Sequence, residues 1–133
     1  MSRENVEIVR QIFRAFNSED IDRVLALTHT EFELEVPPAL SAEPDIYRGH
    51  DGMRRYWESF QDAMDEIRLQ PERLCDAGEA VVVAMKLTAK GRRTAIAVEQ
   101  RTAGVWTIRD GKVIRIRAYV SLAEALASAG LAE

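Results

Sequence analysis

The first third of the chain places its apolar residues at the spacing of amphipathic helices. One apolar stripe recurs every three or four positions: Val6, Val9, Ile12, Phe13 and Phe16. This period predicts a helix that ends near residue 17, where the polar segment 17–20 interrupts the pattern. A short second helix, with apolar residues again at helical spacing, is expected from residue 21.

A half-buried strand is predicted next, because Phe32, Leu34 and Val36 alternate with glutamates. Pro37 and the proline after it end this strand, since proline has no backbone N–H to donate. Residues 39–49 include a proline and a glycine and are expected to form a loop.

Two further helices are predicted from capping patterns and apolar faces. Asp51 is the expected N-cap of one of them, and Ser121 with Glu124 forms a capping-box pattern that opens the other. The apolar face of the first consists of Met53, Trp57, Phe60 and Met64.

From residue 66 the chain has the pattern of successive strands. Pro71 predicts that the first of these strands lies at a sheet edge or contains a bulge. Residues 80–85 are apolar at almost every position, which is typical of a central strand covered on both faces. A strand at about 94–109 and the Asp110-Gly111 turn predict a β-hairpin.

Helices come first and strands come last in this order of elements. Such an order predicts an α+β fold in which helices pack on one face of a mostly antiparallel sheet. The 133 residues suffice for one domain with a sizeable core, so a single domain over residues 1–133 is expected.

The charge balance limits the kinds of partner. The chain carries 18 Lys and Arg against 22 Asp and Glu, which argues against a nucleic-acid-binding protein. No apolar run approaches the roughly 20 residues that span a bilayer, and the N-terminus lacks the apolar segment of a signal peptide. Cys75 is the only cysteine, so no internal disulfide can form. We therefore expect a cytoplasmic protein that binds neither nucleic acid nor membrane.

The predicted hairpin indicates which side chains share a face of the sheet. A two-residue turn pairs Val105 with Ile116, and directly paired residues lie on the same face. The aliphatic face is expected to point inward, under the helices: Ala103, Val105, Thr107, Ile114, Ile116, Ala118 and Val120. The other face is expected to point outward: Trp106, Ile108, Val113, Arg115, Arg117 and Tyr119. A slipped turn or one bulge would reverse this assignment.

Two expectations depend on these orientations. Continued along the same strand, the inward parity places Glu99 and Arg101 on a wall of small residues, which is the composition of a cavity lining. On the outward face, Trp106 and Ile108 would form an apolar patch. That patch is expected either to be covered by arginine stems or to form a homodimer through the outer face of the sheet.

Three segments carry a family resemblance through their order and spacing. They read YRGHDGMRRYW (47–57), WTIRDGKVIRIRAY (106–119) and EALASAGL (124–131). Together with the two N-terminal helices and the long sheet, they resemble the SnoaL-like branch of the nuclear transport factor two superfamily. The resemblance spans essentially the whole chain. It implies a conical α+β barrel, with a curved sheet wrapped on the helices and a pocket at the wide end, and it implies that dimers are common.

The superfamily includes ketosteroid isomerases, polyketide cyclases, dehydratases and epoxide hydrolases, so the fold alone settles no function. In ketosteroid isomerases a general-base Asp precedes a proline at the end of the first strand, and the matching position is Val36. Their oxyanion-hole Tyr matches Ile12, and their protonated Asp matches Ala103 or Gly104. The resemblance therefore implies that proton transfer beside a carbonyl lacks its base and its donors here.

Polyketide cyclases of the family imply an acid/base residue in the pocket. Glu99 is the inward carboxylate that the strand parity supplies, and Arg101 shares its face. Two interpretations stay open for this pair. The two charges neutralise each other, or Glu99 acts as a base while Arg101 receives developing enolate charge.

Aromatic residues are the main candidates for contact with a ligand. In the resembling family Trp57 lies at the helix position that faces the pocket. With two aromatic neighbours, the facing helix and the pocket positions compared above, the candidate ligand-binding set is Phe16, Tyr47, Trp57, Phe60, Val36 and Ala103. The alternative is that the aromatic residues are ordinary core.

No metal site and no cofactor are expected. His29 and His50 match no spacing of metal ligands, and the neighbouring glutamates are interpreted as a solvated strand edge. The RGHDG segment lacks the pattern of a phosphate-binding loop. Cys75 is interpreted as a small core residue.

Two functions remain open at this point. The first is a small-molecule pocket protein that binds a hydrophobic ligand of polyketide- or steroid-like type, with weak cyclase, isomerase or lyase activity or with none. The second is a non-catalytic homodimeric interaction module whose pocket is filled by its own side chains.

Overall fold

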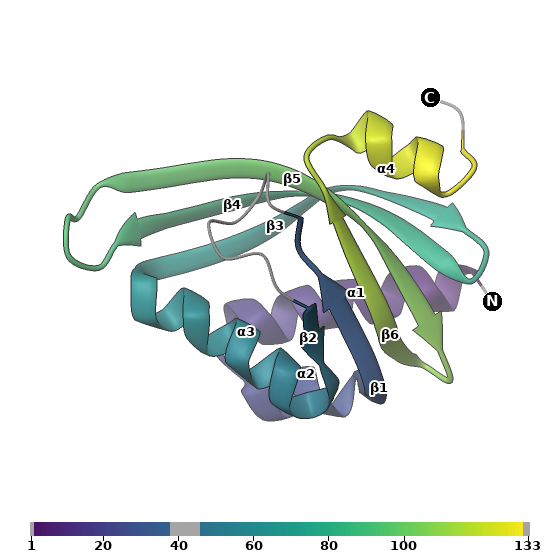
Figure 1. Ribbon diagram of the computed structural model, residues 1–133, viewed down its shortest axis with the longest axis horizontal. Coiled ribbons are helices and arrows are strands. Elements are labelled where there is room, and N and C mark those ends of the chain that lie inside the picture. The colour runs from purple at the N-terminus through teal and green to yellow at the C-terminus, as the bar shows by residue number, and fades with distance from the viewer. Residues whose placement is uncertain (1, 38–45, 132–133) are drawn as a thin grey trace.

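The computed structural model describes residues 2–37 and 46–131 and has an α+β architecture (Figure 1). In chain order the elements are α1 (Ser2–Asn17), α2 (Ile21–Ala26), β1 (Thr28–Glu35), β2 (Ile46–Arg48), α3 (Gly49–Ala63), β3 (Met64–Ala77), β4 (Ala80–Gly91), β5 (Ala97–Arg109), β6 (Lys112–Tyr119) and α4 (Leu122–Ser128). The strands form a six-stranded sheet in the order β2-β1-β6-β5-β4-β3. Neighbouring strands are antiparallel except for β1 and β6, so the predicted fold class is confirmed.

The sheet separates two unequal layers of helix (Figure 1). The helices α1, α2 and α3 lie on one side of it, here called the inner face, and the short α4 lies on the other, the outer face. The main core fills the space between the inner face and the three helices, where Val9, Phe32 and Val113 are almost completely buried. A smaller cluster joins α4 to the outer face through Val82 and Leu126.

The strand β4 is covered on both faces, as its apolar run predicts. Val81 and Val83 belong to the main core, and Val82 belongs to the cluster beneath α4. The edge position of β3 is also confirmed, and its register shifts between Pro71 and Arg73. A proline is tolerated there because an edge strand leaves part of its backbone unpaired.

The start of α3 differs from the prediction. The helix begins at Gly49, which has a φ of 65°, and the capping position is Arg48 at the end of β2. Asp51 therefore lies in the first turn and is not the N-cap. By contrast, Ser121 caps α4 as predicted, because its side chain accepts a hydrogen bond from the Glu124 N–H at 3.2 Å.

The expected loop at 39–49 is partly replaced by the short strand β2, which pairs with the end of β1 through Leu34 and Tyr47. Residues 38–45 lie outside the described residues. Asn17 fixes the end of α1 to the edge strand β3. Its side-chain amide donates to the Leu69 carbonyl and accepts from the Leu69 N–H, each at 2.8 Å.

The β5–β6 hairpin has the predicted turn but contains a bulge. Ile108 pairs with Val113 as a two-residue turn requires, whereas Thr107 pairs with Arg115. Ile114 is therefore one extra residue in β6, and every pair beyond it is displaced by one position.

The bulge changes which face of β5 points inward. Trp106 now pairs with Ile116, so these two side chains share the inner face. Ile116 and Ala118 point inward as predicted, but the predicted inward positions Ala103 and Val105 pack beneath α4 on the outer face. The outward orientation predicted for Trp106, Ile108 and Val113 is wrong, since all three belong to the main core.

Candidate functional site

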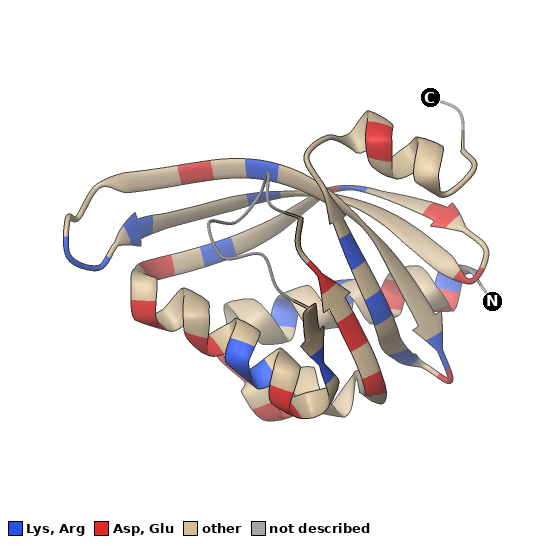
Figure 2. Ribbon diagram, viewed as in Figure 1, with Lys and Arg blue, Asp and Glu red and all other residues tan. Residues whose placement is uncertain are grey.

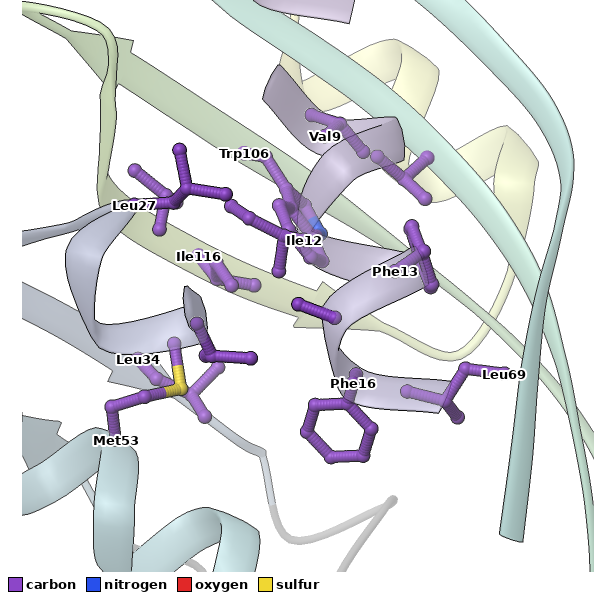
Figure 3. Close-up of a cluster of buried hydrophobic side chains, with 14 of the residues drawn as sticks. Val9, Ile12, Phe13, Phe16, Leu27, Leu34, Met53, Leu69, Trp106 and Ile116 are labelled. Carbon is purple, nitrogen blue, oxygen red and sulfur yellow. The ribbon is translucent and has the colours of Figure 1, made fainter. Parts of the chain in front are cut away.

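A cavity of about 350 Å³ lies between the helices and the inner face of the sheet. Side chains from α1, α3 and the strands of the sheet converge on it. Figure 3 shows Phe13 and Phe16 of α1 on one side and Ile116 of β6 on another, with Leu34 and Met53 completing this part of the interior. The wall is largely apolar because these elements turn their buried stripes toward one another.

Four aromatic rings form a continuous wall along one side of the cavity, here called the aromatic wall: Phe16, Tyr47, Tyr56 and Phe60. Successive rings meet edge to face. The centroid of Tyr56 lies 5.4 Å from that of Tyr47 and 4.9 Å from that of Phe60, and Phe60 lies 6.0 Å from Phe16. This geometry suits the electrostatics of aromatic pairs and fixes the positions of the rings.

Trp106 forms part of the wall from the side of the sheet. Its ring stacks on Phe13 at a centroid distance of 5.4 Å, and only 9% of the residue is exposed. It has this position because Gly104, two residues earlier on the same face, leaves room for the indole. A Cβ built on Gly104 would lie 3.3 Å from the indole nitrogen of Trp106.

Five of the six predicted ligand-binding residues line the cavity. They are Phe16, Tyr47, Phe60, Val36 and Ala103. Ala103 borders the cavity while it packs in the cluster beneath α4. Trp57 is not among the lining residues, because its ring is buried in the core and packs edge-on against Phe16 at 4.6 Å.

Sequence reasoning missed Tyr56, which lines the cavity one position before Trp57. A signal for it was present. Met53, Tyr56 and Phe60 are spaced by three and four residues, which is the spacing of one helical face. All three line the cavity.

The polar groups of the wall are few. Among the described lining residues they are the phenols of Tyr47 and Tyr56, the indole N–H of Trp106 and the side chains of Ser59, Gln100 and Thr102. The Ser59 hydroxyl donates to the backbone carbonyl of Tyr56 at 2.6 Å. Burial raises the pKa of the Tyr56 phenol above its ordinary value of 10.0, and the neighbouring Tyr47 raises it further. The Tyr56 side chain is therefore a neutral hydrogen-bond donor across the physiological range.

The positions matched to the ketosteroid isomerase residues do surround the cavity. Ile12, Val36, Ala103 and Gly104 all line it. Among the described lining residues there is no carboxylate, imidazole, thiol, amine or guanidinium. The tyrosine phenols are thus the titratable groups that the described part of the wall presents.

Glu99 and Arg101 do not line the cavity, and the expected inward orientation is wrong. Their side chains are 57% and 60% exposed on the outer face of β5. Glu99 lies 3.4 Å from Lys86, and Arg101 lies 3.1 Å from Glu72 and 3.8 Å from Glu99. The residues of this part of β5 that point inward are Val98, Gln100 and Thr102. The structure therefore does not support the catalytic role expected of Glu99 and Arg101.

The outer face carries further ion pairs. Figure 2 shows acidic residues along β1 beside basic residues along β6. Glu35 and Arg117 face each other there at 3.1 Å. Such exposed pairs contribute about 0–1 kcal/mol each to stability.

No three His, Cys, Asp or Glu side chains converge as metal ligands within residues 2–37 and 46–131. The Nε2 atom of His50 lies 2.8 Å from the Thr28 carbonyl oxygen. Cys75 is half-buried and packs against the cluster beneath α4. In the part of the chain that the structure describes, no helix is long and apolar enough to cross a membrane.

Solved structures with the same fold cover nearly all of this chain. An NTF2-like protein of unknown function from Burkholderia pseudomallei K96243 has a TM-score of 0.78 and 21% identity, over 93% of this chain and 95% of its own. TerC, co-crystallised with polyporic acid, has a TM-score of 0.78 and 22% identity, over 91% and 94%. An NTF2-like protein from Burkholderia xenovorans LB400 has a TM-score of 0.71 and 26% identity, over 97% of each chain.

A comparison with curated proteins gives no match. The family model of the SnoaL-like domain matches residues 9–116, which include every element from most of α1 to the middle of β6. The chain therefore belongs to the SnoaL-like domain family and has the NTF2-like fold.

Proposed function

We propose that this protein binds a hydrophobic small molecule of polyketide- or steroid-like type in the cavity beneath the sheet. The observation that carries the proposal is the cavity itself, of about 350 Å³ with a largely apolar wall. Ligand pockets typically measure about 300–1,000 Å³ and combine apolar walls with a few placed polar groups.

The packing supports a ligand site over a filled core. Well-packed interiors leave few voids larger than a water molecule. Here the rings of the aromatic wall pack edge to face on one another, and together with Met85 and Leu87 of β4 they line an open space. An apolar ring compound would fill this space and gain the contacts that the walls lack.

One similar structure supports a small-molecule ligand. TerC, which shares this fold, was co-crystallised with polyporic acid. In the present chain, the phenols of Tyr47 and Tyr56 are the candidates for polar contact with the bound ligand.

A denaturation series with flat polycyclic and steroid compounds tests the proposal. A compound that binds only the folded protein at 100 times its Kd stabilises it by about 2.7 kcal/mol, which raises the denaturation midpoint. Ala118→Leu adds three carbon atoms to the cavity wall and is expected to abolish the shift. Ala97→Leu makes the same change at an exposed position near the start of β5 and is expected to preserve it.

The proposal is wrong if no compound in the panel moves the midpoint. It is also wrong if Ala118→Leu retains the full shift, because the compound would then bind elsewhere.

A further inference from the structure

The aromatic wall contains two phenols: Tyr47 is the ring at one end of the wall, and Tyr56 lies between two other rings. Tyr56 makes ring contacts with Tyr47 and Phe60, which hold its side chain in place. Among the described residues, its hydroxyl donates to no protein acceptor. Because Tyr56 lines the cavity and the described residues offer its hydroxyl no acceptor, this hydroxyl is a candidate donor to a ligand there.

The Tyr56 hydroxyl, for which the described residues provide no acceptor, limits what can fill the cavity. Burial already disfavours ionisation of the Tyr56 phenol, so the group keeps its proton and needs an acceptor. A ligand that displaces water from the hydroxyl without replacing its hydrogen bond loses affinity. A ligand that carries an oxygen acceptor at this position keeps that hydrogen bond.

The other polar groups of the wall serve this purpose less well. The Ser59 hydroxyl already donates to a backbone carbonyl. The Tyr47 ring carries the Arg55 guanidinium over its face at 5.0 Å, and a Tyr47→Phe variant separates its hydroxyl from that of Tyr56 as the donor. Gln100 is exposed, so its amide can remain bonded to water when the cavity is filled.

Resting on the proposed function, we propose that the ligand is a flat ring compound bearing a carbonyl oxygen, and that the Tyr56 hydroxyl donates the hydrogen bond that orients it. The edge-to-face rings beside Tyr56 present apolar surface to the ring system, while the hydroxyl selects the carbonyl edge. Tyr56 is thus a specificity-determining residue of the cavity.

The test compares fluorene with 9-fluorenone, two tricyclic probes that differ by CH₂ against C=O. Equilibrium dialysis measures both dissociation constants. The unaltered protein is expected to bind 9-fluorenone roughly 3- to 10-fold more tightly, the range of one net hydrogen bond. In Tyr56→Phe, which keeps the ring and its contacts, 9-fluorenone is expected to bind no more tightly than fluorene.

Tyr119→Phe is the matched control, because it removes a phenol hydroxyl whose partner is Ser128 on α4, at 2.5 Å. This variant is expected to keep the preference of the unaltered protein. Equal affinity for the two probes in the unaltered protein overturns the inference but leaves the proposed function standing. A preference that survives Tyr56→Phe, or that is lost instead in Tyr47→Phe, overturns the role of Tyr56. If neither probe binds while a compound of the denaturation panel does, the inference is overturned and the proposed function stands. If no compound of either set binds, the proposed function itself is overturned.

Discussion

At the scale of single residues, Tyr56 best shows how burial and function are connected in this molecule. A phenol placed among aromatic rings is stabilised in its neutral form, because burial disfavours the phenolate. The same burial that holds the ring in the wall therefore keeps its proton available at the cavity.

A pH prediction follows from the raised pKa of Tyr56. Below its ordinary value of 10.0 the phenol is protonated in both the folded and the unfolded state, and the associated stability is fully present. As the pH rises above that value, the unfolded state releases the proton while the folded state retains it. The free energy of unfolding is then expected to fall by up to about 1.4 kcal/mol per pH unit on account of this residue.

Urea denaturation at several pH values between 8 and about 11.5 measures this effect. The decline above pH 10 is expected to be shallower in Tyr56→Phe than in the unaltered protein. Parallel declines in the two proteins would show that Tyr56 titrates in the folded state as it does in the unfolded state.

Glu99 and Arg101 show the opposite case at the same scale. Alternation along β5 predicts both in the cavity, whereas both are exposed on the outer face. In a strand, a one-residue error of parity moves every side chain to the other face. Single-residue predictions of a site in a sheet therefore depend on the register of the whole strand.

At the scale of elements, most of the secondary structure follows from the sequence. The apolar stripe of α1, the continuous apolar run of β4, the proline in β3 and the turn at Asp110-Gly111 each have a direct physical signal. The strand β2 has no comparable signal in the sequence. It has three residues, its surroundings favour a loop, and it forms because the end of β1 offers a partner.

The bulge at Ile114 explains why the faces of β5 could not be predicted from the sequence. Ile114 and Ile116 are chemically alike, so the pattern of β6 fits either register. How the two strands pack decides which of these registers forms. With the bulge, Trp106 lies against Phe13 and Ile116 in the core, and the arginines of β6 remain on the outer face. Burial of a large indole favours this register over one that exposes it.

At the scale of the whole molecule, the outer face of the sheet is where we propose that a homodimer forms. The proposal no longer depends on Trp106, which is buried. The face instead presents ion pairs around Glu99 and Arg101. Because a two-fold interface brings the same patch together from both subunits, a change of charge there acts twice.

Sedimentation velocity tests the proposed dimer. The unaltered protein is expected to sediment with roughly twice the chain mass of 15.0 kDa. Arg101→Glu places another carboxylate beside Glu72 and Glu99 and is expected to shift the equilibrium toward the monomer. Arg14→Glu reverses a charge at an exposed position on α1 and should leave the dimer unchanged. A monomeric parent, or a dimer that Arg101→Glu does not weaken, contradicts this interface.

We propose above all that the cavity beneath the sheet takes a flat ring compound as its ligand. The chain contains two tryptophans, and Trp106 lines the cavity whereas Trp57 is not among its lining residues.

The most direct measurement is a ¹⁵N–¹H correlation spectrum of the protein during titration with 9-fluorenone. We expect the indole N–H resonance of Trp106 to move progressively and to saturate, with a smaller change at Trp57. An unmoved Trp106 resonance at saturating probe, with changes confined to residues of the outer face, would contradict the account.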